Sequence, residues 1–396
     1  MAARGSLVVY RCPLWVPARP SGLKRVLHLA SFALSSFPVM LRQIFWRPDV
    51  VWVVEPPLVC APQAWLVARL SGGKAWLHIQ DYEVDAAFEL GLLRGRGLRQ
   101  LAAAGERWWM RRFDRVSTIS QRMLERAVTK GVSPGRIVLF RNWVAIGQEQ
   151  GTRRKGQGEA GGYRAELGIA DDAVVALYSG NMGGKQGLEI LAEAARICGE
   201  SGRSGFNPEL LRGSDFSPTG SCRTEVRPTG EEADGRRVEI RPTAEVVFIF
   251  CGAGAGRDDL VALCENLPNV HFLDLQPVER LGELLATADI HLLPQRADAA
   301  DLVMPSKLGG MLASARPVVA NARQGTEVAA VVAVCGLVVA PEDGRAFAAA
   351  IMRLAVDVGL RTKLGQAGRE YAAGFLDKER VLADFARALS AVASGS

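Results

Sequence analysis

Residues 173–198, AVVALYSGNMGGKQGLEILAEAARIC, contain the three parts that decide the fold. The run Ala173–Ser179 is continuously apolar and rich in β-branched residues, which is typical of a strand buried on both faces. A glycine-rich turn follows, and Leu188–Cys198 then places apolar residues at helical spacing. A strand, a tight turn and an amphipathic helix in this order predict one unit of a parallel α/β sheet.

The same alternation continues in both directions along the chain. Further short apolar runs are separated by helical patterns, which indicates parallel sheets covered on both faces and therefore the α/β fold class. These candidate strands are Leu7–Tyr10, Asp49–Val54, Lys74–Ile79, Arg115–Ile119, Ile137–Phe140, Glu245–Phe250, Val270–Leu273, Asp289–Leu293, Pro317–Ala320 and Gly336–Ala340.

Two stretches interrupt the alternation and divide the chain. Residues 147–163 begin with GQEQGTRRKGQGEAGG, which is polar, rich in glycine and without periodicity, so we predict a linker there. Residues 201–244 are rich in Gly, Ser, Pro and charge, and predict a disordered insertion in a surface loop. We therefore expect an N-terminal domain at 1–146, a second domain at 164–375 and a C-terminal helix at 376–396.

Length and composition exclude several classes of protein. The chain has 396 residues, of which 48% are apolar and 23% charged, and its formal net charge is +6. These values exclude a largely disordered chain, and seven scattered cysteines without C-x-x-C spacing exclude a small disulfide scaffold. We expect the protein to reside in a reducing cytosol. The modest basic excess, without basic runs interleaved with aromatic residues, does not indicate nucleic-acid binding.

The sequence predicts contact with a membrane surface but no membrane-spanning helix. The longest nearly uncharged stretch, Val26–Leu41, is shorter than the roughly 20 residues that a spanning helix needs. Basic residues in Pro17–Arg25 precede an apolar helix, and Glu106–Arg112 combines two tryptophans with three arginines. Such segments favour binding to an anionic membrane surface. A helix buried between domains is the alternative.

The turn Ser179–Gly187 is the most informative candidate site, because ligands of parallel sheets bind at the carboxyl ends of strands. Its glycines let the backbone approach an anion, the helix start offers free N–H groups, and Lys185 adds a positive charge. It is not a P-loop, because Gln186 replaces the Ser or Thr that would hold magnesium. We interpret it as a diphosphate site. A glycine-rich connection with a solvated lysine is the alternative.

Two further turns are weaker candidates. Cys251–Arg257 has the pattern G-x-G-x-G after a strand, which a tight strand-to-helix turn also requires. Pro305, Ser306 and Lys307 stand before an apolar helix, where a hydroxyl, an ammonium and free N–H groups suit an anion. The alternative there is an N-capping serine with a surface lysine.

The first domain offers His78 near the end of a strand, with Asp81 just beyond it. A single histidine of this kind is more often a satisfied core residue than a catalyst. The chain has four histidines and no H-E-x-x-H motif, so we predict no metal site.

Taken together, these motifs resemble a known family. The runs GNMGGKQGLEIL (180–191), FIFCGAGAGRDDL (248–260), NVHFLDLQPVERL (269–281) and ADIHLLPQRADAADLVMPSKLGGMLASARPVV (288–319) resemble the donor domain of group 1 (family four) retaining glycosyltransferases of the GT-B fold. The run VVEPPLVCAPQAWLVARLSGGKAWLHIQDYEVDAAFELGLL (53–93) is similar to the subset that builds colanic acid and related exopolysaccharides.

The resemblance implies two Rossmann-like domains facing across a cleft, with the acceptor on the first and the nucleotide sugar on the second. It implies metal-independent transfer with no cofactor, and retention at the anomeric carbon. Lys185 would contact the donor diphosphate, and His78 would lie near the reacting sugar; these are the two expected catalytic residues. The expected donor-binding residues are Gly180, Asn181, Gly183, Lys185, Gln186, Gly252, Gly254, Leu275, Gln276, Asp301, Pro305, Ser306 and Lys307.

The sequence departs from the family pattern at two places. Many relatives carry two glutamates eight positions apart, where this chain has Leu302 and Gly310, with Asp301 beside the first. The opening βα unit of the family's first domain is also expected to be absent.

The resemblance implies an enzyme that moves a sugar from a UDP- or GDP-sugar to a polyprenyl-diphosphate-linked oligosaccharide, in exopolysaccharide biosynthesis. It would work in the cytoplasm, on the inner membrane surface and without nucleic acid. Two other functions stay open at this point. One is a non-catalytic sugar-nucleotide-binding scaffold of a polysaccharide assembly complex. The other is a sugar-nucleotide epimerase or hydrolase, which would need a carboxylate pair in the cleft, and the sequence offers no convincing candidates for it outside Asp81 and Glu83.

Overall fold

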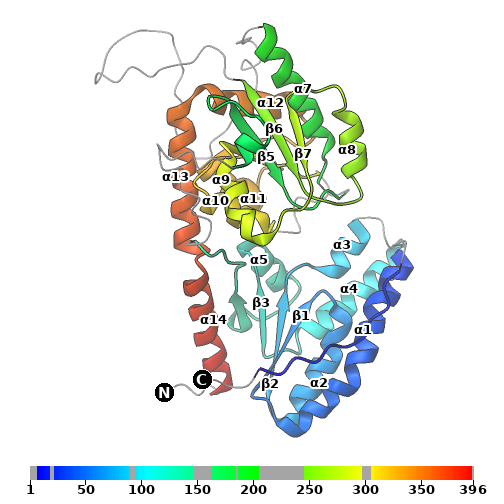
Figure 1. The fold of residues 1–396 in the computed structure, drawn as a ribbon. Helices are drawn as coiled ribbons and strands as arrows, with labels where there is room; N and C mark the ends of the chain where they lie inside the picture. Colours follow the sequence, from blue (N-terminus) through cyan, green and yellow to red (C-terminus); the bar gives the residue numbers. More distant parts are fainter. Residues whose placement is uncertain are drawn as a thin grey trace. The chain divides into compact units, whose positions relative to one another are not determined.

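The chain forms two compact units, each built around one parallel β-sheet (Figure 1). The structure is a computed structural model that describes residues 7–17, 22–89, 95–146, 162–183, 186–204, 245–296 and 305–394. Unit 1 comprises Met1–Arg141 and Leu382–Ser396, and unit 2 comprises Asn142–Val381. The assignment of acceptor and donor roles to domains with boundaries at 146, 164 and 375 stays a prediction.

Unit 1 holds four parallel strands that are paired in chain order. They are β1 (Val50–Glu55), β2 (Lys74–Ile79), β3 (Arg115–Thr118) and β4 (Ile137–Leu139). The register places His78 between Val54 of β1 and Ser117 of β3. The helices of this part of the chain are α1 (Gly22–Arg42), η1 (Gln43–Trp46), η2 (Leu58–Cys60), α2 (Ala61–Ser71), α3 (Glu83–Glu89), α4 (Arg96–Met110), α5 (Gln121–Thr129) and η3 (Pro134–Arg136).

An aromatic cluster covers one face of this sheet. Trp52, Trp76 and His78 alternate along β1 and β2 and therefore point to the same side. Phe385 of helix α14 (Lys378–Ala393) stacks on Phe140 with ring centroids 3.9 Å apart, and also contacts Trp52 and Trp76. The last helix is thus part of the core of unit 1.

The predicted strand Leu7–Tyr10 is wrong. Residues 7–17 form no regular secondary structure, and the four side chains of the predicted strand are between 56% and 89% exposed. A β-branched run becomes a strand only where a neighbouring strand pairs with it, and β1, the edge strand of the described sheet, pairs only with β2.

In the residues that the structure describes, unit 2 holds six parallel strands in the order β10-β9-β8-β5-β6-β7. They are β5 (Val174–Ser179), β6 (Val246–Cys251), β7 (Val270–Leu273), β8 (Ile290–Leu293), β9 (Val318–Asn321) and β10 (Gly336–Val339). The connecting helices are α6 (Tyr163–Glu166), α7 (Glu189–Ser204), α8 (Arg257–Leu263), η5 (Val278–Arg280), α9 (Leu281–Thr287), α10 (Lys307–Ala313), α11 (Glu327–Cys335), α12 (Gly344–Val356) and α13 (Val358–Phe375).

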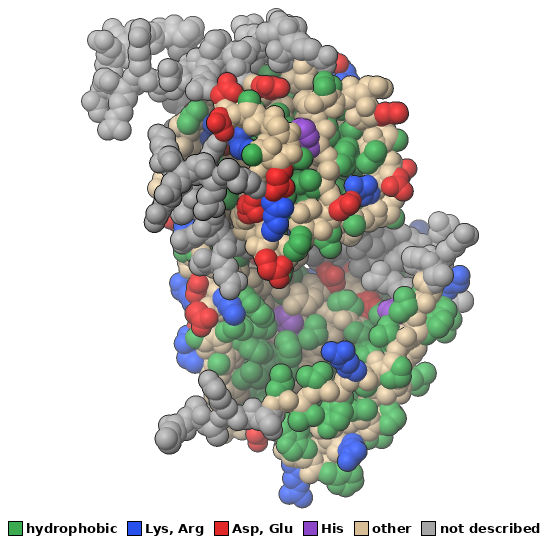
Figure 2. Space-filling view, viewed as in Figure 1, with side chains coloured by type: hydrophobic (Ala, Val, Ile, Leu, Met, Phe, Trp, Pro, Cys, Tyr) green, Lys and Arg blue, Asp and Glu red, His purple; other side chains and the backbone are tan. Residues whose placement is uncertain are grey.

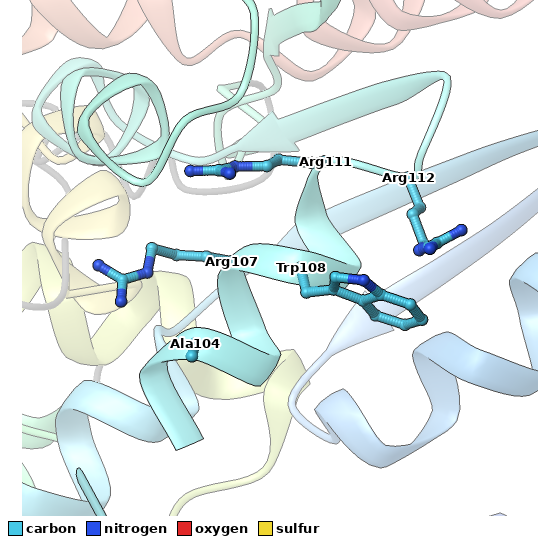
Figure 3. Close-up of a pocket in the computed structure, with 5 residues that line it drawn as sticks. All are labelled: Ala104, Arg107, Trp108, Arg111 and Arg112. Atoms are coloured by element: carbon cyan, nitrogen blue, oxygen red, sulfur yellow. The ribbon is translucent and has the colours of Figure 1, made fainter. Parts of the chain in front are cut away.

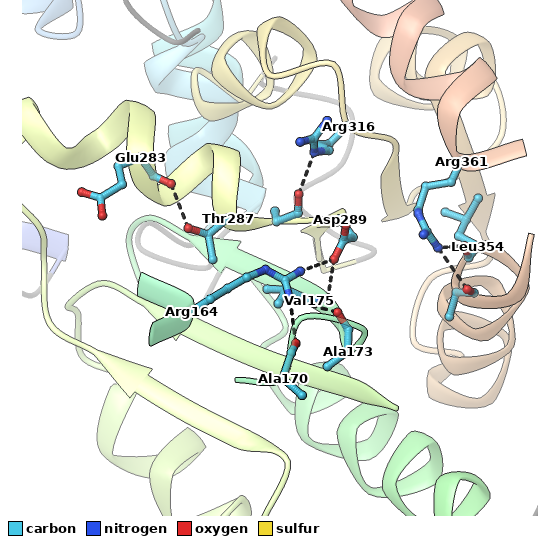
Figure 4. Close-up of polar contacts among 12 residues, drawn as sticks. Arg164, Ala170, Ala173, Val175, Glu283, Thr287, Asp289, Arg316, Leu354 and Arg361 are labelled. Atoms are coloured by element: carbon cyan, nitrogen blue, oxygen red, sulfur yellow. Dashed lines mark hydrogen bonds and ion pairs between the residues drawn. The ribbon is translucent and has the colours of Figure 1, made fainter. Parts of the chain in front are cut away.

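Both faces of this sheet are buried, as the continuous apolar strands predict. Alternate residues of β5 and β6 pack with α7, α8 and α12 on one face. The residues between them pack with α6 and α9 on the other face, where α10 and α11 cover β8 and β9. At the amino ends of β5 and β8, Asp289 accepts hydrogen bonds from Arg164 and from the backbone N–H of Val175, at 2.6 and 3.0 Å (Figure 4).

Several predicted boundaries shift by a few residues. The helix predicted to end at Cys198 continues to Ser204, so the first four residues of the predicted insertion are helical; residues 205–244 lie outside the described residues. Tyr163, predicted as the last linker residue, begins α6 and is buried against the guanidinium of Arg280, whereas 147–161 lie outside the described residues. Helix α10 begins at Lys307 rather than Gly309.

Among the helices of the described segments, none combines the length and the apolarity needed to cross a membrane. Large exposed apolar side chains are instead concentrated in unit 1, which holds 20 of the 28 found in the described residues. Figure 2 shows hydrophobic side chains gathered over the region of α1 and α2.

Candidate functional site

The candidate site lies where the strand order of unit 2 reverses. Strands β5 and β8 are neighbours, and the chain continues from β5 toward β6 and β7 on one side and from β8 toward β9 and β10 on the other. Ligands of open parallel sheets bind outside the carboxyl ends of the strands at such a switch point. Gly180 follows β5 directly, and Lys307 begins the helix that follows β8.

The two glycine turns pack backbone against backbone. Gly180 N–H donates to Cys251 O, and Met182 N–H donates to Ala253 O, at 3.0 and 2.9 Å. A Cβ at Gly252 would lie 1.9 Å from Gly180 O, and one at Gly254 would lie 2.5 Å from Met182 O. Both of these glycines have positive φ. Close approach of the first turn thus explains the G-x-G pattern of the second turn, whose direct contact with a ligand stays a prediction.

Internal hydrogen bonds hold the first turn in place. The Tyr178 hydroxyl donates to Asn181 O at 2.6 Å, and Gly183 N–H donates to Gln186 Oε1 at 3.1 Å. Gln186 thus closes the loop in the position where a P-loop would carry a magnesium ligand. Lys185, the predicted catalytic cation of this loop, lies outside the described residues, as does Asp301.

Lys307 is the most unusual group at this edge. Its Nζ is buried and has no hydrogen-bond partner among the residues that the structure describes. It lies 4.2 Å from the ring centroid of Tyr178, and a Cβ at Gly180 would be 3.4 Å from Lys307 Cδ. Burial lowers the pKa of Lys307 to about 8. A cation without a hydrogen-bond partner beside a glycine backbone is the arrangement that an anion would complete.

The other residues of the P-S-K segment are less constrained. Ser306 is exposed, and its side chain makes no capping bond to α10, so the interpretation as an N-capping serine is wrong. Pro305 O accepts the Leu308 N–H at 3.0 Å. The described residues therefore assign no capping role to the Ser306 hydroxyl.

Leu275 and Gln276 lie after β7, two strands away from β5. The Gln276 amide donates to Asp274 O and accepts from the Tyr163 hydroxyl at 2.9 Å, so its side chain is held in place. Leu275 is 72% exposed and contributes an unshielded apolar surface. The structure therefore places this pair at the same edge as the glycine turns, but not beside Lys307.

His78 is in unit 1 and is fully enclosed. Gln80 Nε2 lies 2.8 Å from His78 Nε2, and Nδ1 lies 2.9 Å from Ser117 Oγ, which also accepts from Trp76 Nε1. With the Gln80 amide as the donor, the imidazole is neutral and carries its proton on Nδ1. Burial lowers its pKa to about 4. A direct role for His78 stays a prediction, and it requires that a substrate replace the Gln80 amide.

Unit 1 also carries a basic pocket of about 490 Å³ near the C-terminal end of α4. It is lined by Arg107, Arg111, Arg112, Trp108 and Ala104 (Figure 3). The Arg112 guanidinium stacks on the Trp108 ring at 3.7 Å, and the described residues that line the pocket include no acidic side chain. Because α4 ends just before β3 begins, the pocket lies toward the amino edge of the sheet, away from the carboxyl end of β2 that carries His78.

Comparison with known proteins decides the family. A glycosyl transferase 4-like domain matches residues 2–143, and the family glycosyl transferases group 1 matches residues 235–357. WcaI of Escherichia coli K12, assigned as a colanic acid biosynthesis glycosyl transferase, is 37% identical over 392 residues, which cover 96% of this chain and 83% of that protein. The chain belongs to the group 1 glycosyltransferases.

Solved structures agree on the fold of this glycosyltransferase. Sucrose-phosphate synthase from Thermosynechococcus elongatus superposes with a TM-score of 0.66 at 16% identity, over 96% of this chain and 81% of that one. Anabaena HepE, in complex with UDP and glucose, superposes with a TM-score of 0.62 at 14% identity, over 89% of this chain and 82% of the HepE chain. The predicted GT-B class, with two Rossmann-like domains, and the prediction of a glycosyltransferase are confirmed.

Sequence reasoning missed Tyr178, which contacts both halves of the candidate site. The signal was present, since a tyrosine at the next-to-last position of an otherwise aliphatic strand stands directly before the glycine turn. Its ring contact depends on where Lys307 lies, and Lys307 is 129 positions further along the chain than Tyr178, so strand periodicity alone does not reveal this contact.

Proposed function

We propose that this glycosyltransferase transfers a sugar from a nucleoside diphosphate sugar to a lipid-linked oligosaccharide during synthesis of a colanic-acid-like exopolysaccharide. The observation that supports the donor class is Lys307, whose buried ammonium has no hydrogen-bond partner in the described segments and lies against Gly180 at the switch point of the sheet. The relationship to WcaI supports the pathway class, and HepE, which shares the fold, was crystallised in complex with UDP and glucose.

In this proposal the cations of unit 2 stabilise the leaving group. Negative charge builds up on the nucleoside diphosphate as the bond to the sugar breaks, and fixed cations in a site of low dielectric stabilise such charge strongly. Lys307 and Lys185 would bind the diphosphate oxygens, the side-chain-free backbone at Gly180 and Gly183 would let the diphosphate approach closely, and Ser306 would add a hydroxyl. Leu275 and Gln276 would bind near the base. The reaction would then need no metal and would retain the anomeric configuration.

A calorimetric titration with UDP and with GDP tests the donor site. We expect saturable binding of one nucleotide, and at least tenfold weaker binding by Lys307→Ala and by Lys185→Ala (about 1.4 kcal/mol each). Lys363→Ala, which removes an exposed lysine of α13 in the same unit, is the matched control and should bind as the wild type does. Binding of neither nucleotide by the wild type would contradict the donor assignment.

Turnover with a lipid-linked acceptor tests the rest of the reaction. Lys185→Ala should lower the rate far more than it lowers stability, and activity that stays within about tenfold of the wild type (about 1.4 kcal/mol of barrier) would exclude Lys185 as a catalytic cation. Proton NMR of the first product formed should show the anomeric configuration of the donor; inversion would refute retention. His78→Asn tests the second predicted catalytic residue in the same assay.

We also propose that unit 1 contacts the cytoplasmic surface of the inner membrane. The observations that support this are the Arg107–Arg112 pocket with its stacked Trp108 and the excess of exposed apolar side chains in the same unit. Arginine attracts anionic headgroups, and a half-exposed tryptophan suits the interface between headgroup and acyl chain.

Co-sedimentation with vesicles checks the membrane contact. The wild type should bind vesicles that contain phosphatidylglycerol and release them as salt rises, whereas Arg107→Ala combined with Arg111→Ala should bind several times more weakly. Arg345→Ala combined with Lys363→Ala removes the same charge from exposed positions of unit 2 and is the control. Equal loss in both double variants would mean that net charge, and not this pocket, carries the binding.

A further inference from the structure

We propose that Tyr178 is a positioning residue for the donor diphosphate, because one side chain holds both the Lys307 ammonium and the turn at 180–182. This inference rests on the donor site proposed above. Tyr178 is fully buried on β5, at the next-to-last position of the strand. Its hydroxyl and its ring face contact different elements, so the two contacts can be removed separately by substitution.

The hydroxyl fixes the glycine turn. It donates to Asn181 O at 2.6 Å, and this bond adds to the backbone bonds that Gly180 and Met182 make with Cys251 and Ala253. Burial raises the pKa of the Tyr178 hydroxyl, so it stays protonated and remains a donor throughout the neutral and mildly alkaline range. The turn therefore meets a ligand with its backbone already ordered, which lowers the entropy lost on binding.

The ring face holds the cation. Lys307 Nζ lies 4.2 Å from the ring centroid and makes no hydrogen bond within the described part of the chain, which therefore leaves its N–H donors unused. A carboxylate in place of the ring would also hold the ammonium, but it would occupy these donors and compete with a phosphate. A π-face attracts a cation without accepting its N–H bonds in this way. Tyr178 thus keeps Lys307 in place and leaves its donors free for a diphosphate.

The charge of Lys307 then links nucleotide binding to pH. Burial alone lowers its pKa to about 8, and no acidic side chain is among the causes. The titratable group that faces Nζ from β5 is Tyr178, and its neighbour across the turn is the uncharged Gly180. Only the protonated lysine attracts a phosphate, so affinity should fall as pH rises through about 8. Loss of the Tyr178 ring removes an attraction for the Lys307 ammonium and therefore lowers the pKa of Lys307 further. The fall in nucleotide affinity then occurs at lower pH.

The experiment compares Tyr178→Phe with Tyr178→Met in titrations with UDP and with GDP between pH 7 and pH 9. Tyr178→Phe keeps the ring and loses the bond to Asn181 O, so we expect several-fold weaker binding at every pH with the fall still near pH 8. Tyr178→Met loses both contacts, so we expect about tenfold weaker binding at pH 7 and a fall displaced by about one pH unit downward. Circular dichroism checks that each variant is folded.

Lys307→Arg keeps the Tyr178 side chain and supplies a charge that does not titrate in this range. Its nucleotide affinity should not fall between pH 7 and pH 9, which tests the link to Lys307 even if Tyr178→Met does not fold. A Tyr178→Phe variant that binds as the wild type does, or a Tyr178→Met variant whose fall stays near pH 8, would overturn the role of Tyr178 and leave the donor site standing. If the wild type binds neither nucleotide, both the role of Tyr178 and the proposed donor site are overturned.

Discussion

At the scale of single residues, Lys307 destabilises the fold at neutral pH. A buried ammonium without a hydrogen-bond partner loses its free energy of hydration. The attraction to the Tyr178 ring compensates for only part of this loss. Its pKa falls from 10.5 to about 8 on folding, so the unfolded chain binds more protons than the native one between these values. The stability penalty is therefore fully present below pH 8 and is relieved as pH rises toward 10.5.

Replacement of Lys307 by methionine should stabilise the protein at pH 7 by up to about 3 kcal/mol. The gain should shrink steadily between pH 8 and pH 10.5, because the neutral amine of the wild type no longer carries the penalty. Urea unfolding of both proteins at a series of pH values measures the difference, in which the titration of all other groups cancels. A Lys307→Met variant that is less stable than the wild type at pH 7 would show that the ammonium has a partner in solution.

At the scale of elements, the two glycine turns form one packed layer at the carboxyl edge of unit 2. Each turn supplies the backbone groups that the other bonds, and the absence of side chains at Gly252 and Gly254 permits this distance. The strand periodicity predicted both turns, because each follows an apolar run. Their contact with each other depends on β5 and β6 being neighbours in the sheet.

Gly252→Ala should destabilise unit 2 by more than about 3 kcal/mol, through both a positive φ and a clash of the new Cβ with Gly180 O. Gly325→Ala is the matched control, because its φ of +84° is also positive but open space surrounds it, so backbone strain of about 1 kcal/mol is expected there. Thermal unfolding of both variants separates the clash from the strain. Equal losses would mean that the two turns move apart in the variant.

At the same scale, unit 1 distinguishes the effect of strand propensity from the effect of pairing between strands. Lys74–Ile79 has in the structure the same bounds as in the prediction, whereas Leu7–Tyr10, which is the more uniformly apolar run, is exposed and irregular. The two runs differ in whether they have neighbouring strands. β2 lies between β1 and β3, which form hydrogen bonds with its backbone on both sides. Composition therefore predicts where a strand can form, and pairing decides whether it does.

At the scale of the whole molecule, the two units should respond differently to acid. Each holds a buried neutral histidine, and burial lowers the pKa of His78 to about 4 and of His291 to about 3. Because the unfolded histidines bind protons first, the stability of both units falls as pH drops below 6.5. In unit 1 the buried carboxyls of Glu55 and Glu106, whose pKa values are raised by burial, act with the opposite sign.

Unit 2 should therefore lose about 2 kcal/mol between pH 7 and pH 5 through His291, and unit 1 should lose less. Seven of the eight tryptophans belong to unit 1, so tryptophan fluorescence during urea unfolding reports mainly on that unit. Hydrogen exchange of peptides from β5, β6 and β8 reports on unit 2. His291→Gln should be less stable at pH 7 but should show a shallower dependence on pH. A larger acid loss in unit 1 than in unit 2 would contradict the expectation.

The α/β class and ten of the eleven predicted strands followed from the sequence alone, because apolar periodicity and glycine turns are local properties of the chain, whereas the family was suggested by a resemblance and shown by the comparison with known proteins. The sequence also placed Lys307 and the glycine turns among the candidate site residues. Only the tertiary structure decided that Tyr178 lies between them, that Gly252 and Gly254 serve the packing of two loops, and that both ring nitrogens of His78 are occupied. Each of these depends on which strands become neighbours, and burial then sets the charge of the groups enclosed between them.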